Sequence, residues 1–182
     1  MLTDLTERAM RGDREAFTTL ASIVGDRLYA VAYRILRDPH RAEDAVQQTL
    51  LIAWRQLPRL RDAERIEAWL RRLLVHACFA DIRREKRWQP PIHVVPVDEP
   101  GAPDTTLNVV IRDELERAFR RLSPEQRAVL VLHHYLGLSG AEIGQALGIS
   151  HGTVRSRLYY ARIAMRAALA ADARGAATGG TA

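Results

Sequence analysis

Apolar side chains recur at helical spacing along almost the whole chain, and no segment of useful length alternates apolar and polar residues as a strand does. The stripe in residues 13–37 predicts one helix broken at Gly25, or two successive helices, because glycine lowers helix stability. We therefore predict an all-α protein of two small helical domains, each stabilised by packed amphipathic faces. The apolar positions of this first stripe are Phe17, Leu20, Ile23, Val24, Leu28, Val31, Ala32, Ile35 and Leu36.

A second helix is predicted from Pro39 to about Leu57, because Asp38 can cap it and proline suits the first helical position. Its apolar side, which includes Trp54, is expected to face the core. Its other side is polar but weakly charged, which favours a protein groove over DNA as the partner. That side carries Arg41, Glu43, Asp44, Gln47, Gln48 and Thr49.

An arginine-rich loop, residues 58–63, follows this helix, and a long helix is predicted over residues 64–88. The long helix ends in a basic run that has two interpretations. Cations at a helix C-terminus complement the helix dipole, and they also form a surface that can face phosphates. The basic residues are Arg83, Arg84, Lys86 and Arg87.

A change of composition divides the chain into two domains. Residues 89–109 contain five prolines and several acids without periodicity, which predicts an extended, flexible linker between an N-terminal domain, residues 1–88, and a C-terminal domain, residues 110–170. The small-residue tail, residues 171–182, is expected to be disordered.

The pattern near the end of the chain predicts two short helices joined by a sharp turn. Ser139 and Glu142 have capping-box spacing, Gly148 suits a left-handed turn, and Ser150 can cap the second helix. A small core is expected from Ile143, Leu147, Ile149, Val154 and Leu158.

The second helix of this pair presents polar and basic residues outward, and no acid occurs between His151 and Ala171. A glycine turn followed by a basic helix is typical of a helix-turn-helix whose second helix enters the major groove of DNA. The alternative is an ordinary helical hairpin with a solvated arginine face. The candidate DNA-contacting residues are His151, Thr153, Arg155, Ser156, Arg157 and Arg162.

Charge and cysteine usage agree with a nucleic-acid-binding protein of a reducing compartment. The net charge is +5 and the pI is about 10.0, which suits a polyanionic partner. Lys86 is the only lysine, a bias that favours forked phosphate and guanine contacts but also fits a GC-rich genome. The single cysteine, the polar N-terminus and the absence of a long apolar run favour the cytoplasm, without membrane insertion.

No constellation in the sequence indicates catalysis, a metal or a cofactor. His76 and Cys78 are two residues apart and do not share a helix face, and the neighbours of Cys78 indicate the core. His133 and His134 are adjacent, so we expect one to be packed and one exposed. No glycine-rich phosphate loop follows a strand. We expect a protein that is not an enzyme.

Four segments together resemble a known family: DREAFTTL, DPHRAEDAVQQTLLIAWRQL, RIEAWLRRLLVHACFADIRREKR and LSPEQRAVLVLHHYLGLSGAEIGQALGISHGTVRSRLYYARIAMR. They cover most of residues 13–168, in the same order as in the extracytoplasmic-function (ECF, group IV) sigma factors of bacterial RNA polymerase, and with the linker in the same place. The chain is identified from them as a member of that class.

The resemblance implies contacts with both polymerase and DNA. The flap and the clamp of the largest subunit of core polymerase would be the protein contacts, and the clamp would bind Asp44, Gln47, Gln48, Leu51 and Trp54. The loop residues Arg61, Asp62, Glu64 and Arg65 would capture a flipped base of the minus-10 element, and the basic end of the long helix would hold phosphates there. The outward residues of the helix-turn-helix would read the minus-35 element.

The leading hypothesis is therefore a sigma factor that directs polymerase to promoters, assists melting, and is controlled by an anti-sigma partner. One alternative is a stand-alone helix-turn-helix regulator with a helical sensor domain, which would bind an operator unaided, usually as a dimer. A helical adaptor that binds only protein is a third, but it leaves the acid-free second helix unexplained.

Overall fold

The computed structural model describes the backbone of residues 1–88 and 107–178, and the side chains of residues 1–85 and 114–171. Every regular element in these ranges is helical, so the predicted all-α class is confirmed. Within them, no helix has the length and apolar character needed to cross a bilayer. Most of the expected linker and the last four residues of the expected tail lie outside the described residues.

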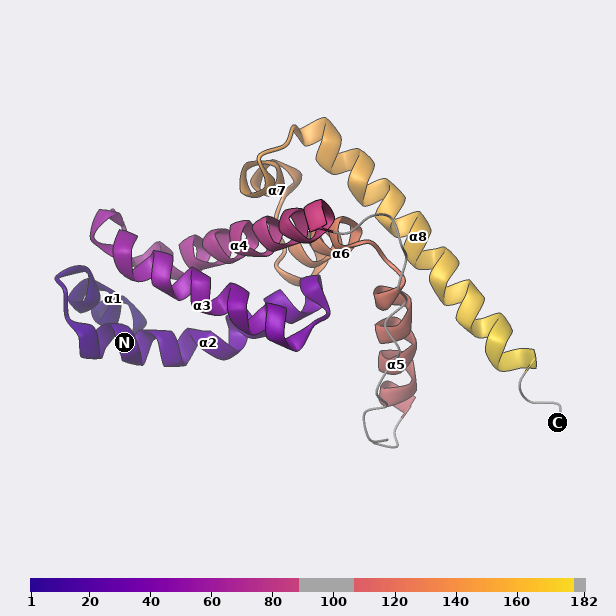
Figure 1. The fold of residues 1–182 in the computed structure, drawn as a ribbon, viewed down its shortest axis with the longest axis horizontal. Coiled ribbons are helices and arrows are strands. Elements are labelled where there is room, and N and C mark those ends of the chain that lie inside the picture. The colour runs from indigo at the N-terminus through magenta and orange to yellow at the C-terminus, as the bar shows by residue number, and fades with distance from the viewer. Residues whose placement is uncertain (89–106, 179–182) are drawn as a thin grey trace.

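The N-terminal part consists of α1 (Leu2–Met10), α2 (Arg14–Leu36), α3 (Pro39–Gln56) and α4 (Ile66–Trp88), with short 3-10 turns η1 (Leu57–Arg59) and η2 (Ala63–Arg65) between the last two (Figure 1). The Asp38 carboxylate accepts a hydrogen bond from the Arg41 amide at 2.9 Å, so the predicted cap of α3 is confirmed. The sequence pattern did not predict the helix α1, because the N-terminal segment is largely polar and charged.

The break expected at Gly25 is wrong, because α2 is one continuous helix of 23 residues. Val24 and Leu28 are both buried on either side of the glycine. Packing of that apolar face outweighs the roughly 1 kcal/mol that a glycine costs inside a helix. The helix ends instead at Arg37, which has left-handed backbone angles (φ 59°) and donates its amide to the Tyr33 carbonyl at 2.8 Å.

Two residues predicted on the outer side of α3 turn inward. Thr49 is fully buried, and its hydroxyl donates to the Ala45 carbonyl at 2.7 Å, which satisfies the only polar group it buries. Arg41 reaches across to α4, where its guanidinium contacts Asp81 and Glu85, both at 2.6 Å. The polar side of α3 is therefore narrower than the sequence pattern indicated.

The C-terminal part consists of α5 (Leu107–Arg120), α6 (Pro124–Leu130), a widened π-helical turn η3 (Val131–Tyr135), α7 (Gly140–Leu147) and α8 (His151–Thr178). A capping box begins α6: the Ser123 hydroxyl accepts from the Gln126 amide, and the Gln126 side chain accepts from the Ser123 amide. The helix α8 continues to Thr178, into the segment for which disorder is expected from residue 171. The segment is rich in alanine, the residue with the highest helix propensity.

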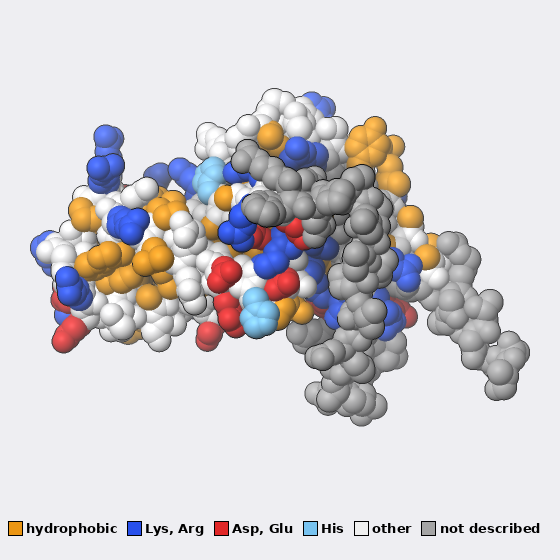
Figure 2. Space-filling view, viewed as in Figure 1, with side chains coloured by type: hydrophobic (Ala, Val, Ile, Leu, Met, Phe, Trp, Pro, Cys, Tyr) orange, Lys and Arg blue, Asp and Glu red, His pale blue; other side chains and the backbone are white. Residues whose placement is uncertain are grey.

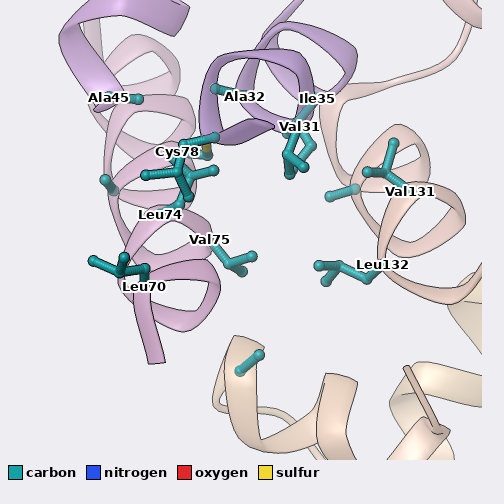
Figure 3. Packing of buried hydrophobic residues seen from close by; sticks show 14 of the residues in the cluster. Val31, Ala32, Ile35, Ala45, Leu70, Leu74, Val75, Cys78, Val131 and Leu132 are labelled. Atoms are coloured by element: carbon teal, nitrogen blue, oxygen red, sulfur yellow. The ribbon is translucent and has the colours of Figure 1, made fainter. Parts of the chain in front are cut away.

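The two parts share one apolar core. Figure 3 shows Val131 and Leu132 of η3 facing the α2 residues Val31 and Ile35, with Val75 of α4 beside them. All five side chains are buried. The predicted architecture of two helical domains is confirmed, and in this structure the domains also touch: α6 and η3 pack against α2, and α7 packs against α4.

Candidate nucleic-acid and protein interfaces

The turn between α7 and α8 has the predicted geometry. The Glu142 carboxylate accepts from the Ser139 amide at 2.8 Å and from its hydroxyl at 2.7 Å, and the Ser139 hydroxyl accepts from the Glu142 amide at 3.3 Å. These hydrogen bonds hold the pKa of Glu142 below its ordinary value. Gly148 has φ 65°, the left-handed conformation expected of it. The helix-turn-helix is confirmed.

Close approach of the two helices depends on Gly144, which the sequence reasoning did not single out. A Cβ atom at this position would lie 2.9 Å from the Ile149 carbonyl oxygen, so only glycine lets the turn fold back on α7. Ile143 and Val154 are fully buried beneath it, as predicted. The sequence feature from which this close approach could have been predicted is a glycine in the interior of an otherwise regular short helix.

The outward residues of α8 fall into two groups. Thr153 belongs to the helix cap, since its amide donates to the Ser150 hydroxyl at 3.1 Å, and Arg157 is half-buried. The other four predicted residues are exposed and available to a ligand. They are His151, Arg155, Ser156 and Arg162.

Three exposed apolar or aromatic side chains lie on the same stretch of α8, and the sequence reasoning assigned them no role. Tyr159, Tyr160 and Ile163 are 62 %, 63 % and 45 % exposed. Tyr159 and Ile163 follow Arg155 by four and eight residues. Helical spacing therefore places Arg155, Tyr159 and Ile163 on one face of α8. That spacing was the signal from which they could have been found.

The loop between α3 and α4 is held in shape by one of its own candidate residues. The Asp62 carboxylate accepts from the Glu64 amide at 3.0 Å and contacts the Arg65 guanidinium at 3.1 Å. Arg61, Glu64 and Arg65 are all exposed. The structure thus brings the four predicted loop residues together at one end of α4, with Asp62 orienting the turn.

The basic end of α4 is exposed where its side chains are described. Arg83 and Arg84 face solvent, and Arg84 contacts the Asp81 carboxylate at 2.7 Å. The side chains of Lys86 and Arg87 lie outside the described residues. Asp81 also contacts Arg41, so part of the cationic charge here is already neutralised within the protein.

The α3 surface combines exposed polar residues with one exposed apolar side chain. Asp44, Gln47 and Gln48 are exposed, and Leu51 is 55 % exposed. Trp54 is half-buried, with its ring centroid 5.0 Å from that of Phe17, so it contributes to the core as well as to the surface. Figure 2 shows hydrophobic side chains reaching the surface over these N-terminal helices, on the left of the view. Such a surface suits a protein partner.

The remaining titratable candidates are structural. Burial raises the pKa of the Cys78 thiol to about 12, so the thiol is protonated and unreactive at neutral pH. His133 is half-buried with Nδ1 3.0 Å from the Leu138 carbonyl oxygen, whereas His134 is exposed, as predicted. Within the described side chains, no three His, Cys, Asp or Glu residues are grouped so that they could hold a metal ion.

Comparison with known proteins finds a family match for each part of the chain. The family model "Sigma-70 region 2" matches residues 20–88, and "Sigma-70, region 4" matches residues 112–165. The ECF RNA polymerase sigma factor SigL of Mycobacterium tuberculosis is 38 % identical over 149 residues, which cover 78 % of this chain and 82 % of SigL. SigE of Mycolicibacterium smegmatis is 32 % identical over 167 residues, which cover 87 % of this chain and 65 % of SigE.

Solved structures give the same result. The sigma factor RpoE of Bartonella quintana, crystallised with the anti-sigma factor NepR, has a TM-score of 0.64 and 26 % identity, with 86 % of this chain and 98 % of that one covered. CnrH in complex with the cytosolic domain of CnrY has a TM-score of 0.58 and 26 % identity, with 94 % and 98 % covered. The chain belongs to the ECF sigma factors of RNA polymerase, a family that is not enzymatic. RNA polymerase core and promoter DNA are the partners that this membership implies.

Proposed function

We propose that this sigma factor recognises promoters through two separate surfaces and binds core polymerase through a third. The loop of residues 61–65, with the basic end of α4, would bind the minus-10 element. The exposed face of α8, centred on Arg155, would read the minus-35 element. The α3 surface around Leu51 would dock on the clamp of the largest polymerase subunit, and the C-terminal part would contact the flap.

The observation that carries this proposal is the separation of the three surfaces by chemistry. The face of α8 carries exposed Arg155 and Arg162, and forked guanidinium groups suit guanine edges and phosphates. The loop carries donors and acceptors of both signs, which suits the edge of a single flipped base. The face of α3 is exposed, mildly polar and centred on an apolar side chain, which suits protein.

Control by an anti-sigma partner is part of the same proposal. Both solved relatives described above were crystallised with a second protein, the anti-sigma factor NepR in one and the cytosolic domain of CnrY in the other. An equivalent protein would keep this chain from polymerase in the cytoplasm until a signal releases it.

Transcription in vitro tests the proposal. The full chain is mixed with core polymerase and supercoiled genomic promoter DNA, and transcripts are mapped. We expect initiation at discrete promoters only when the chain is present, and weak binding to the same DNA without polymerase. Tight, specific DNA binding by the chain alone, without any transcript, would instead establish a stand-alone regulator.

A further inference from the structure

The short helix α1 carries an apolar stripe that none of the three proposed surfaces includes. Leu2, Leu5, Thr6 and Ala9 recur at the spacing of one helix face. Thr6 and Ala9 are buried, and the two leucines are half-buried and pack against the apolar core. The Thr6 hydroxyl donates to the Leu2 carbonyl at 2.8 Å, which satisfies the polar side chain that this face buries. The stripe therefore docks α1 onto the rest of the N-terminal part.

The helix α1 docks against the two turns that shape the proposed base-capturing loop. Besides α2, it contacts both η1 and η2, which lie on either side of residues 60–62. Figure 1 shows α1 at the left end of the view, where α3 passes into α4. Leu57 and Ile66, at the two ends of the loop, are buried, and Leu60 is half-buried. The inner side of the loop thus rests on apolar packing to which α1 contributes.

A corner of the chain fixes the position of α1. Only residues 11–13 join it to α2. The Arg8 guanidinium donates through Nε and Nη2 to Oδ2 of Asp13, at 3.0 and 2.8 Å. Oδ1 of the same carboxylate accepts from the Ala16 amide at 3.0 Å, in the first turn of α2. One carboxylate therefore caps α2 and ties α1 to it, so that α1 stays seated over the turns.

The loop gains from such support because the bonds that shape it are local. Asp62 bonds only as far as Glu64 and Arg65, and the side chains of Arg61, Glu64 and Arg65 are exposed. Short 3-10 turns have poor hydrogen-bond geometry, and segments with few buried contacts open at low free energy. A loop that opened in this way would have to be ordered again when a base binds, which costs affinity.

We propose that α1 is a positioning element for capture of the minus-10 base. Its apolar stripe holds η1 and η2 in the shape in which residues 61–65 meet the base. This inference rests on the proposed function. In this role α1 acts through the loop and not on DNA directly. Loosening α1 therefore weakens the reading of one promoter element and leaves polymerase binding and the other element unchanged.

Leu5→Ala tests the proposal, because it removes apolar volume from the stripe and keeps every proposed DNA-binding and polymerase-binding residue. The full chain is assembled with core polymerase and titrated with labelled fork-junction DNA, which is single-stranded across the minus-10 element of a promoter that the wild-type chain uses. We expect binding to weaken about fivefold, and the preference for the native bases over substituted ones to fall by about the same factor. Affinity for core polymerase and for minus-35 duplex should be unchanged.

The matched control is Glu7→Ala, at an exposed position on the outer face of the same helix, which should behave as wild type. Leu5→Met conserves volume and should restore DNA binding. If Leu5→Ala does not fold by circular dichroism, Leu2→Ala removes the same volume from the first turn of α1 and decides the matter. A folded stripe variant that binds and discriminates as wild type does overturns the proposal, and so does an equal defect in Glu7→Ala.

Amide hydrogen exchange in the free chain measures the support of the loop without polymerase or DNA. The Leu60 amide donates to the Leu57 carbonyl at 3.0 Å, and the Arg65 amide donates to the Asp62 carbonyl at 3.2 Å. Both amides should exchange about tenfold faster in Leu5→Ala than in the wild-type chain. Equal exchange in the two proteins would show that α1 does not hold the loop, and the proposal fails.

Arg61→Ala separates this inference from the proposed function. If loss of this exposed loop side chain leaves minus-10 binding unchanged while Leu5→Ala still loosens the loop, the base-capturing role is wrong, and the positioning role for it falls too. If Arg61→Ala weakens minus-10 binding and the loosened loop of Leu5→Ala does not, the proposed function stands and the positioning role alone is overturned.

Discussion

The N-terminal and C-terminal parts of this sigma factor present their proposed DNA-binding residues in different ways. On α8 the candidates follow one another at helical spacing, with Arg155 and Arg162 exposed on a continuous helix. At the start of α4 they sit in a loop whose shape depends on Asp62 bonding a neighbouring amide. A helix face can thus be read from periodicity, whereas the loop surface depends on contacts that orient each side chain separately.

The two parts also differ in how deeply their polar groups enter the core. The N-terminal part buries Thr49 and Cys78 among tightly packed helices. The C-terminal part buries Arg127, whose guanidinium donates to the Ile35 carbonyl at the end of α2 and to the Leu122 carbonyl of its own part. The N-terminal part in turn buries the guanidinium of Arg37 against Glu116 of α5, so each part depends on the other for a buried charge.

The rate at which a disulfide reagent labels Cys78 is expected to show the largest effect. This rate reports how readily the N-terminal core opens. A pKa raised by burial to about 12, against an ordinary value of about 8.5, reduces the thiolate fraction at pH 8 by roughly a thousandfold. We expect a disulfide reagent to react at least a hundred times more slowly with the native chain than with the chain in guanidinium. Fast labelling of the native chain would mean that α4 opens readily.

Arg155→Ala tests the surface of α8. Loss of one base-reading arginine costs about 1–3 kcal/mol, or about ten- to a hundredfold in promoter-specific initiation. Binding of core polymerase should be unchanged, because the proposed polymerase surface lies on α3 and does not include Arg155. Arg157→Ala should have a smaller effect on promoter recognition, since Arg157 is half-buried. Equal loss of polymerase binding in both variants would contradict this division.

Substitutions on α3 should give the reverse result. Asp44→Ala or Leu51→Ala is expected to weaken polymerase binding about tenfold, because each removes one exposed contact of a protein interface. Promoter choice, measured at saturating sigma factor, should stay the same. Leu51→Ala is a cleaner variant than Trp54→Ala, because Trp54 also packs against Phe17 and its loss would destabilise the domain.

Removal of a single cap gives the smallest effect. Ser139→Ala is expected to lower the stability of the C-terminal part by about 1 kcal/mol, measured by urea unfolding. The pKa of Glu142 is depressed in the folded state, so its contribution is present above its unfolded pKa and is lost as the pH falls through the folded pKa. The difference between wild type and Ser139→Ala should therefore shrink in acid. A constant difference would mean that the carboxylate takes no part in the cap.

The sequence by itself determined the features that depend on neighbouring residues. The Ser139–Glu142 box, the turn at Gly148 and the cap at Asp38 involve residues at most a few positions apart, so the pattern contains all the interacting groups. Amphipathic periodicity likewise indicated the helices and the outward face of α8. The candidate loop residues, in contrast, rest on the family resemblance, because their roles follow from no local rule.

The tertiary structure alone decided which polar residues are inside and how the two parts meet. Continuity of α2 through Gly25 depends on apolar packing on both sides of that residue, and the inward turn of Arg41 depends on Asp81, 40 positions away. Arg127 and Ile35 are 92 positions apart, and no periodicity connects them. A buried charge is stable only where hydrogen-bond acceptors are brought to it, so the contact of Arg127 with Ile35 is a property of the fold that no stretch of sequence contains.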